Sequence, residues 1–90
     1  MFQNYPWSTG QATLNGTASL IVAANPSRSG ITINNTGTTP VYLVENSSGT
    51  VSTGYFLPGV VGASIGFATT GAIYGITSGA SATVTYLVTQ

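Results

Sequence analysis

The stretch that decides the fold is SGITINNTGTTPVYLVE, residues 29–45. Its first part, residues 29–35, alternates apolar and polar side chains, so that its two isoleucines share one face of a strand. A turn-forming run at 36–39 follows, and residues 40–45 read as an apolar return strand. Two strands separated by such a turn predict a β-hairpin.

The same pattern of short strands between turns continues along most of the chain. Valine, isoleucine, threonine and tyrosine dominate these stretches, and no stretch has an apolar period of 3.6 residues. We therefore expect an all-β fold, a small antiparallel β-sandwich or barrel of the jelly-roll or immunoglobulin-like type, with about six to eight short strands. The expected strands cover residues 18–24, 29–35, 40–45, 50–57, 63–67, 72–76 and 81–89.

The N-terminal segment, MFQNYPWSTGQATLNG, shows neither a helical nor a strand period. It carries Phe2, Tyr5 and Trp7, and aromatic side chains of this size are costly to leave in water. We expect residues 1–16 to form an extended arm that docks on this subunit or on a neighbour, and residues 17–90 to form a single all-β domain.

Charge is nearly absent from the chain. Arg28 and Glu45 are its only charged side chains, so charged residues make up 2% of the sequence, against about 25% in a typical soluble domain. A surface near zero net charge tends to associate. The chain also has only 90 residues and no cysteine, so its small core has no disulfide support, and oligomerisation is the usual remaining support. We expect packed neighbours rather than a soluble monomer.

The predicted hairpin places the two lone charges near each other. If Asn35 lies opposite Pro40, then Gly30 lies opposite Glu45, and Arg28 is a diagonal neighbour of Glu45 on the same face. This register predicts a structural ion pair. The alternative is that the guanidinium donates to turn carbonyls near Asn25. Either role is structural, because one cation makes no binding patch.

The sequence lacks the residue types that most chemistry needs. It has no histidine, cysteine, lysine or aspartate, so no serine or threonine has a base to activate it and no donor set suggests a metal site. One arginine cannot neutralise several phosphates, which argues against nucleic-acid binding. We expect no catalytic, cofactor-binding or metal-binding residues, and not an enzyme.

A membrane interpretation of residues 57–76 has to be weighed, because this uncharged segment is long enough to span a bilayer and carries glycines four residues apart. Threonines, a serine and several glycines dilute its hydrophobicity, and no basic flank sets an orientation. We therefore expect no membrane association.

Three blocks of the sequence resemble a recurrent pattern in small bacteriophage virion proteins. They are IVAANPSRSGITINNTGTTPVYLVEN (21–46), TGYFLPG (53–59) and GAIYGITSGASATVTYLV (71–88). The same module occurs in capsid decoration proteins, head fibres and tail-associated adaptors. The resemblance implies an all-β homo-oligomer, often a trimer, without catalysis, in which the arginine after the proline is structural.

The leading hypothesis is a phage virion structural protein that decorates or cements a capsid. Its partners would be copies of itself and the major capsid protein or another virion protein, on the virion surface after synthesis in the host cytoplasm. Phe2, Tyr5 and Trp7 would anchor the interface, together with Val41 and Leu43, which lie on the hairpin face opposite Ile31 and Ile33. The alternatives are a head-fibre or tail-associated adaptor that binds a receptor or glycan, and a non-viral β-rich surface or fimbrial subunit.

Overall fold

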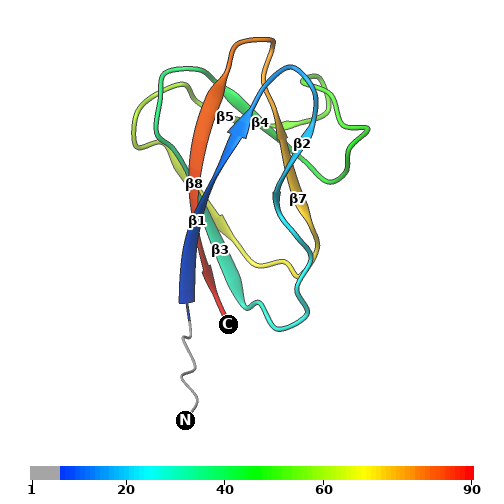
Figure 1. Ribbon diagram of the computed structural model, residues 1–90, viewed down its shortest axis with the longest axis vertical. Coiled ribbons are helices and arrows are strands. Elements are labelled where there is room, and N and C mark those ends of the chain that lie inside the picture. Colours follow the sequence, from blue (N-terminus) through cyan, green and yellow to red (C-terminus); the bar gives the residue numbers. More distant parts are fainter. Residues whose placement is uncertain (1–6) are drawn as a thin grey trace.

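A computed structural model describes residues 7–90, and all the regular structure in this part of the chain is β-strand (Figure 1). The strands are β1 (Trp7–Leu14), β2 (Ser19–Val22), β3 (Gly30–Asn35), β4 (Val41–Val44), β5 (Tyr55–Leu57), β6 (Ser64–Phe67), β7 (Ile73–Ile76) and β8 (Ala82–Thr89). The all-β prediction is confirmed.

The eight strands form two four-stranded antiparallel sheets that pack as a sandwich. The strand order is β1-β8-β3-β6 in the first sheet and β2-β7-β4-β5 in the second. Only the β4–β5 connection stays within one sheet, and every other connection between consecutive strands crosses to the opposite sheet. This is the double Greek-key arrangement of a jelly roll rather than the immunoglobulin arrangement or a closed barrel.

Each strand expected from residue 18 onward overlaps an observed strand, but the expected strand at 50–57 is much shorter. Only Tyr55–Leu57 pair in the sheet as β5. The segment before β5 lies against β4 instead, because Gly49 and Gly54 approach the side chain of Val44 so closely that a Cβ on either glycine would overlap it or press against it. The absence of side chains at these two positions lets the β4–β5 loop cover part of the second sheet.

The prediction of an N-terminal arm over residues 1–16 was wrong for its second half. Trp7–Leu14 form β1, which pairs with β8 over eight residues, and Leu14 is fully buried in the core. The strand was hidden in the sequence because its inward positions include Gly10, whose Cβ site is filled by the ring of Tyr86. The domain therefore begins before residue 17. Residues 1–6, including Phe2 and Tyr5, lie outside the described residues.

The predicted β3–β4 hairpin was also wrong, because the two strands belong to different sheets. β3 pairs with β8 and β6, while β4 pairs with β7 and β5. The turn after β3 crosses the sandwich instead of reversing within one sheet. Asn35 fixes that crossing, since its side-chain amide donates to the carbonyl oxygens of Thr39, within the turn, and Pro58, after β5.

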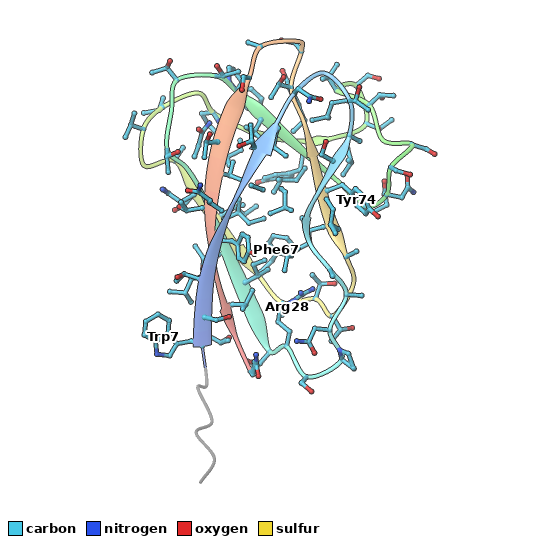
Figure 2. All side chains as sticks on the ribbon, in the orientation of Figure 1. Trp7, Arg28, Phe67 and Tyr74 are labelled. Atoms are coloured by element: carbon cyan, nitrogen blue, oxygen red, sulfur yellow. The ribbon has the colours of Figure 1, made fainter. Side chains whose placement is uncertain are left out.

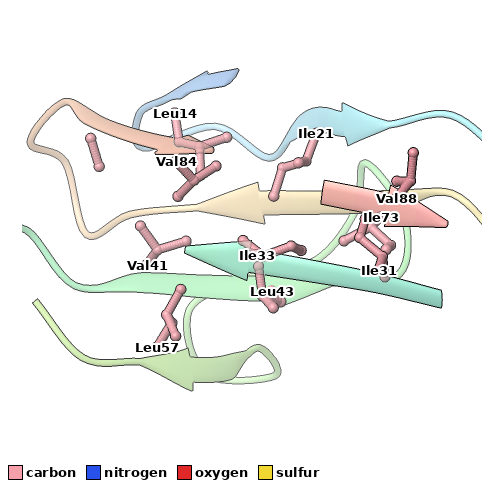
Figure 3. Close-up of a cluster of buried hydrophobic side chains, with 11 residues drawn as sticks. Leu14, Ile21, Ile31, Ile33, Val41, Leu43, Leu57, Ile73, Val84 and Val88 are labelled. Carbon is pink, nitrogen blue, oxygen red and sulfur yellow. The ribbon is translucent and has the colours of Figure 1, made fainter. Parts of the chain in front are cut away.

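The core lies between the two sheets and is entirely aliphatic at its centre (Figure 3). The alternation predicted for β8 is confirmed, because Ala82, Val84 and Val88 are buried and Tyr86 packs against them. Residues 57–76, weighed above as a membrane segment, contribute to β5, β6 and β7. Within residues 7–90 there is no helix long and apolar enough to cross a membrane. The core cluster consists of Leu14, Ile21, Ile31, Ile33, Val41, Leu43, Leu57, Ile73, Ala82, Val84 and Val88.

Replacing Leu14 with alanine tests whether β1 is an integral strand of the domain. Truncating a fully buried leucine costs about 2–5 kcal/mol of stability, because it removes apolar contact and leaves a cavity. We expect the L14A variant to lose this amount in chemical denaturation, while T13A, one residue earlier on the outer face of the same strand, changes stability by about 0.5 kcal/mol or less. Equal stability of L14A and wild type would contradict the placement of β1.

Candidate interaction surfaces

Arg28 lies almost completely buried at one end of the sandwich, with 5% of its surface exposed (Figure 2). Its guanidinium donates hydrogen bonds to three backbone carbonyl oxygens. Nε bonds to Thr69 at 2.8 Å, Nη1 bonds to Ala23 at 3.0 Å, and Nη2 bonds to Gly71. Ala23 follows β2, and Thr69 and Gly71 lie between β6 and β7, so one side chain ties together two loops that are far apart in sequence.

Backbone hydrogen bonds reinforce the contact between the same two loops. The Asn25 amide donates to the Thr70 carbonyl at 2.9 Å, and the Arg28 amide donates back to the Asn25 carbonyl at 3.1 Å. The Asn25 side chain also accepts from the Ser27 amide. Each of the two loops connects one sheet to the other, so this network, the Arg28 clamp, holds both sheets together at this end of the fold.

The register that predicted an Arg28–Glu45 ion pair does not exist, because the hairpin on which it was based is not formed. Glu45 is exposed at the end of β4. The hydrogen bonds of the guanidinium within residues 7–90 all go to carbonyl oxygens, which is the alternative role that the sequence left open.

Asn35 is a second buried polar side chain, and sequence reasoning did not single it out as a site residue. It is fully buried at the end of β3, where its amide nitrogen donates to two carbonyls and its Oδ1 accepts from the Gly37 amide at 3.0 Å. Its backbone also exchanges hydrogen bonds with the β5–β6 loop. The sequence signal was present, since asparagine ends an otherwise alternating strand just before a turn, where its side chain commonly bonds the backbone two residues on.

The outer face of the second sheet is apolar, although it faces away from the core. Along β4 and β7 the side chains that do not enter the core are Tyr42, Val44, Tyr74 and Ile76. The strand pairing extends these into two rows across the sheet, because Leu20 lies opposite Tyr74 and Phe56 lies opposite Tyr42. We call this surface the apolar face; it consists of Leu20, Tyr42, Val44, Phe56, Tyr74 and Ile76.

The edges of the apolar face are open to solvent. Leu20 is 47% exposed and Phe56 is 51% exposed. Phe56 packs on Tyr42 with ring centroids 5.4 Å apart and planes tilted by 52°. Tyr74 projects outward from β7 in Figure 2. The outer face of the first sheet differs in composition, because threonine dominates there, at positions 9, 13, 32, 83, 85 and 89.

The structure distributes the expected interface residues differently from the prediction. Val41 and Leu43 are buried in the core, so they are not available to a partner. The outward side chains of this strand are Tyr42 and Val44, one position out of phase with the predicted interface residues. Trp7 is 55% exposed and points away from the sandwich, as Figure 2 shows. Its role as an interface anchor stays a prediction.

An open pocket of about 420 Å³ lies between the two sheets on the side where β5 and β6 form their edges. Its floor is apolar and includes Ile65 and Phe67, while Glu45, Thr53 and Tyr55 bring polar groups to its lining. Aromatic, carboxylate and hydroxyl groups around an apolar floor can hold a small polar ligand by stacking and hydrogen bonding.

No protein-family model matches the chain, and no curated protein matches its sequence. Its fold is similar to parts of several solved structures. One is an HTH_3 family transcriptional regulator from Vibrio cholerae, with a TM-score of 0.67 and 10% identity over 94% of this chain and 43% of that one. Another is the stem and receptor-binding domain of the spike protein P1 from bacteriophage PM2, with a TM-score of 0.62 and 14% identity over 89% and 32%.

A third similar structure is RmlC from Streptococcus suis in complex with dTDP-D-xylose, with a TM-score of 0.56 and 15% identity over 93% of this chain and 44% of that one. The chain thus spans less than half of each of these proteins, from 32% to 44%. Their roles differ widely, as is common for a fold that hosts many functions. At these identities the likeness shows the jelly-roll fold alone.

Replacing Arg28 with methionine tests the clamp. The variant keeps much of the aliphatic volume but leaves three inward carbonyls without their donor, so we expect a loss of roughly 2–4 kcal/mol in the free energy of unfolding. Because Glu45 is exposed and outside the clamp, E45Q is the matched control and should change stability by about 0.5 kcal/mol or less. Equal losses in the two variants would restore the ion pair and contradict the carbonyl clamp.

Proposed function

We propose that the chain is a bacteriophage virion structural protein that decorates or cements the capsid shell. The observation that carries the proposal is the apolar face, whose edge residues Leu20 and Phe56 are open to solvent on a sheet whose other side already forms the core, while Val44 and Ile76 are themselves buried. Exposed apolar patches mark interaction sites in soluble proteins. The aromatic side chains of this face are of the kind that dominates interface energetics.

The mechanism is the burial of surface rather than a reaction. Each Å² of apolar surface removed from water contributes about 25 cal/mol, before the costs of association are subtracted. The exposed side chains of the apolar face carry no charge, so a partner can cover them without desolvating an ion. We assign this face to the contact with the major capsid protein or another virion protein.

Two further observations support a virion role. The sequence resembles the small phage virion proteins described above, and a phage spike protein uses a similar fold in a domain described as a stem and receptor-binding domain. The resemblance also implies self-association, most often as a trimer. We extend the proposal to a non-catalytic homo-oligomer on the virion surface that binds neither nucleic acid nor membrane.

The pocket beside β5 favours a second candidate, a head-fibre or tail-associated adaptor that binds a receptor or glycan. Tyr55 is 61% exposed at this pocket and can stack on a sugar ring, while Glu45 and Thr53 can accept and donate hydrogen bonds to its hydroxyls. In this candidate the pocket binds the ligand, and the apolar face attaches the domain to the particle.

The decoration proposal predicts that the chain is present in purified particles of the virus that encodes it, in a fixed ratio to the shell protein. Particles prepared without the chain should rebind the wild-type protein, and the double variant L20K/F56K should bind at least ten times more weakly. Both substitutions fall on exposed positions of the apolar face, so the fold should survive. Quantitative mass spectrometry and co-sedimentation measure the two quantities.

The matched control is T32K, which adds a lysine to the outer face of the first sheet at another exposed position and should bind like wild type. Absence of the chain from particles would contradict the virion role. Normal rebinding of L20K/F56K would contradict the assignment of the apolar face. A loss of binding to host-surface glycans in Y55A, with particle binding intact, would favour the adaptor over the decoration protein.

A further inference from the structure

Within residues 7–90, the longest sheet edge with no strand paired to it is β1. It forms one edge of the first sheet and runs for eight residues in unbroken register with β8. The other three edge strands are short: β6 and β2 have four residues each, β2 with an irregular register, and β5 has three. Native proteins usually protect a long edge with lysine, proline or a bulge. The β1 sequence, WSTGQATL, contains no charge and no proline, and its pairing with β8 shows no bulge.

The hydrogen-bond pattern identifies which residues of β1 face the open edge. At the end of β3, the Asn35 amide donates to the Ala63 carbonyl on the β6 side, whereas the next amide, that of Thr36, donates to the Thr83 carbonyl of β8 at 3.3 Å. The backbone groups of successive β3 residues therefore point alternately to β6 and to β8. Antiparallel pairing alternates in the same way across β8 to β1. The backbone groups of Trp7, Thr9, Gln11 and Thr13 therefore point away from β8, toward the open edge.

The same four residues turn their side chains to the outer face of the first sheet, because Leu14 and Ala12 turn inward. A second copy of this strand can therefore pair antiparallel with the first, with the backbone hydrogen bonds formed and the side chains of the two strands on the same face. Residues opposite each other must both belong to this set, so that open-edge amides meet open-edge carbonyls and side chains stay on matching faces. A two-fold axis keeps open-edge residues opposite each other only when it passes through a residue of β1, and not when it passes between two residues.

We propose that two copies of the chain pair edge to edge through β1, with the two-fold axis at Gly10. This register sets Trp7 opposite Thr13 of the other copy and Thr9 opposite Gln11, in both directions. The result is four hydrogen-bonded residue pairs, and, at two bonds for each pair, about eight backbone hydrogen bonds. The two first sheets become one continuous eight-stranded sheet.

The neighbouring register with its axis at Gln11 satisfies fewer groups. An axis at Gln11 would require Asn15 opposite Trp7, but the Asn15 carbonyl already accepts a hydrogen bond from the Thr77 amide at 2.8 Å. An axis at Gly10 also places the half-exposed ring of Trp7 beside the methyl group of Thr13 from the other copy. The contact brings no like charges together across the axis, because β1 has no charged side chain.

This contact is separate from the apolar face and from the attachment to a particle. An isologous contact closes at two copies, so it builds assemblies with an even number of chains. If three copies also associate through another surface, as the resemblance implies, the closed assembly holds six. The pairing of β1 is therefore measured on the purified chain in solution, without particles, so its failure is distinct from a failure of the virion role.

Introduced cysteines test the register, because the chain has none of its own. We expect an equimolar mixture of T9C and Q11C to form a mixed disulfide dimer on mild oxidation, since these positions are opposite each other across the axis. In either variant alone the two cysteines are diagonal, roughly 7–8 Å apart, and should cross-link at least five times less. A mixture that cross-links no better than the single variants overturns the proposed register.

The variant T9K/Q11K tests the contact itself by bringing like charges directly opposite each other across the axis. We expect the solution mass to fall by half, with the unfolding midpoint near that of wild type, because both positions are turned away from the core. The matched control S47K/S48K carries the same charge on the exposed β4–β5 loop, away from the pocket, and should keep the wild-type mass. An unchanged mass for a folded T9K/Q11K, or a wild-type protein of 9.1 kDa in solution, overturns the proposal.

Discussion

One buried cation links the two sheets of the fold at one end. Arg28 brings the only positive side chain of the protein into the end of the sandwich, where three backbone carbonyls surround it. These carbonyls belong to loops that each cross from one sheet to the other. In a domain with a small aliphatic core and no disulfide, this clamp holds the sheets in register at one end, and Asn35 ties crossing loops through its own hydrogen bonds at the end of β3.

Much of the fold could be predicted from the sequence, because alternation and turn residues mark strands locally. Residues 81–89 show this best, since the side chains expected on one face do pack on the core. The sequence could not reveal which strands pair, because a short turn after β3 can reverse within a sheet or cross between sheets. β1 escaped notice for a different reason: Gly10 lies where Tyr86 needs space, so the strand lacks the bulky inward residue that would have marked it.

The candidate surfaces were partly predictable for similar reasons. A strand such as VYLV is apolar at every position, so alternation shows that both faces are covered but does not tell which face is the core. Which side chains of β4 face the core is decided by the position of the opposite sheet, which buries Val41 and Leu43 and leaves Tyr42 outward. For Arg28, composition showed that the residue was structural, but its three carbonyl partners come from sequence positions up to 43 residues away.

Burial of Arg28 also determines how the folded protein meets its surroundings. With that cation enclosed, Glu45 is the one charged side chain that the sequence can present to water. Debye screening acts on exposed charges, so changes in ionic strength have almost nothing to act on. Association through the apolar face should instead follow the temperature and cosolvent dependence of apolar hydration, and it should strengthen with moderate warming and with sulfate.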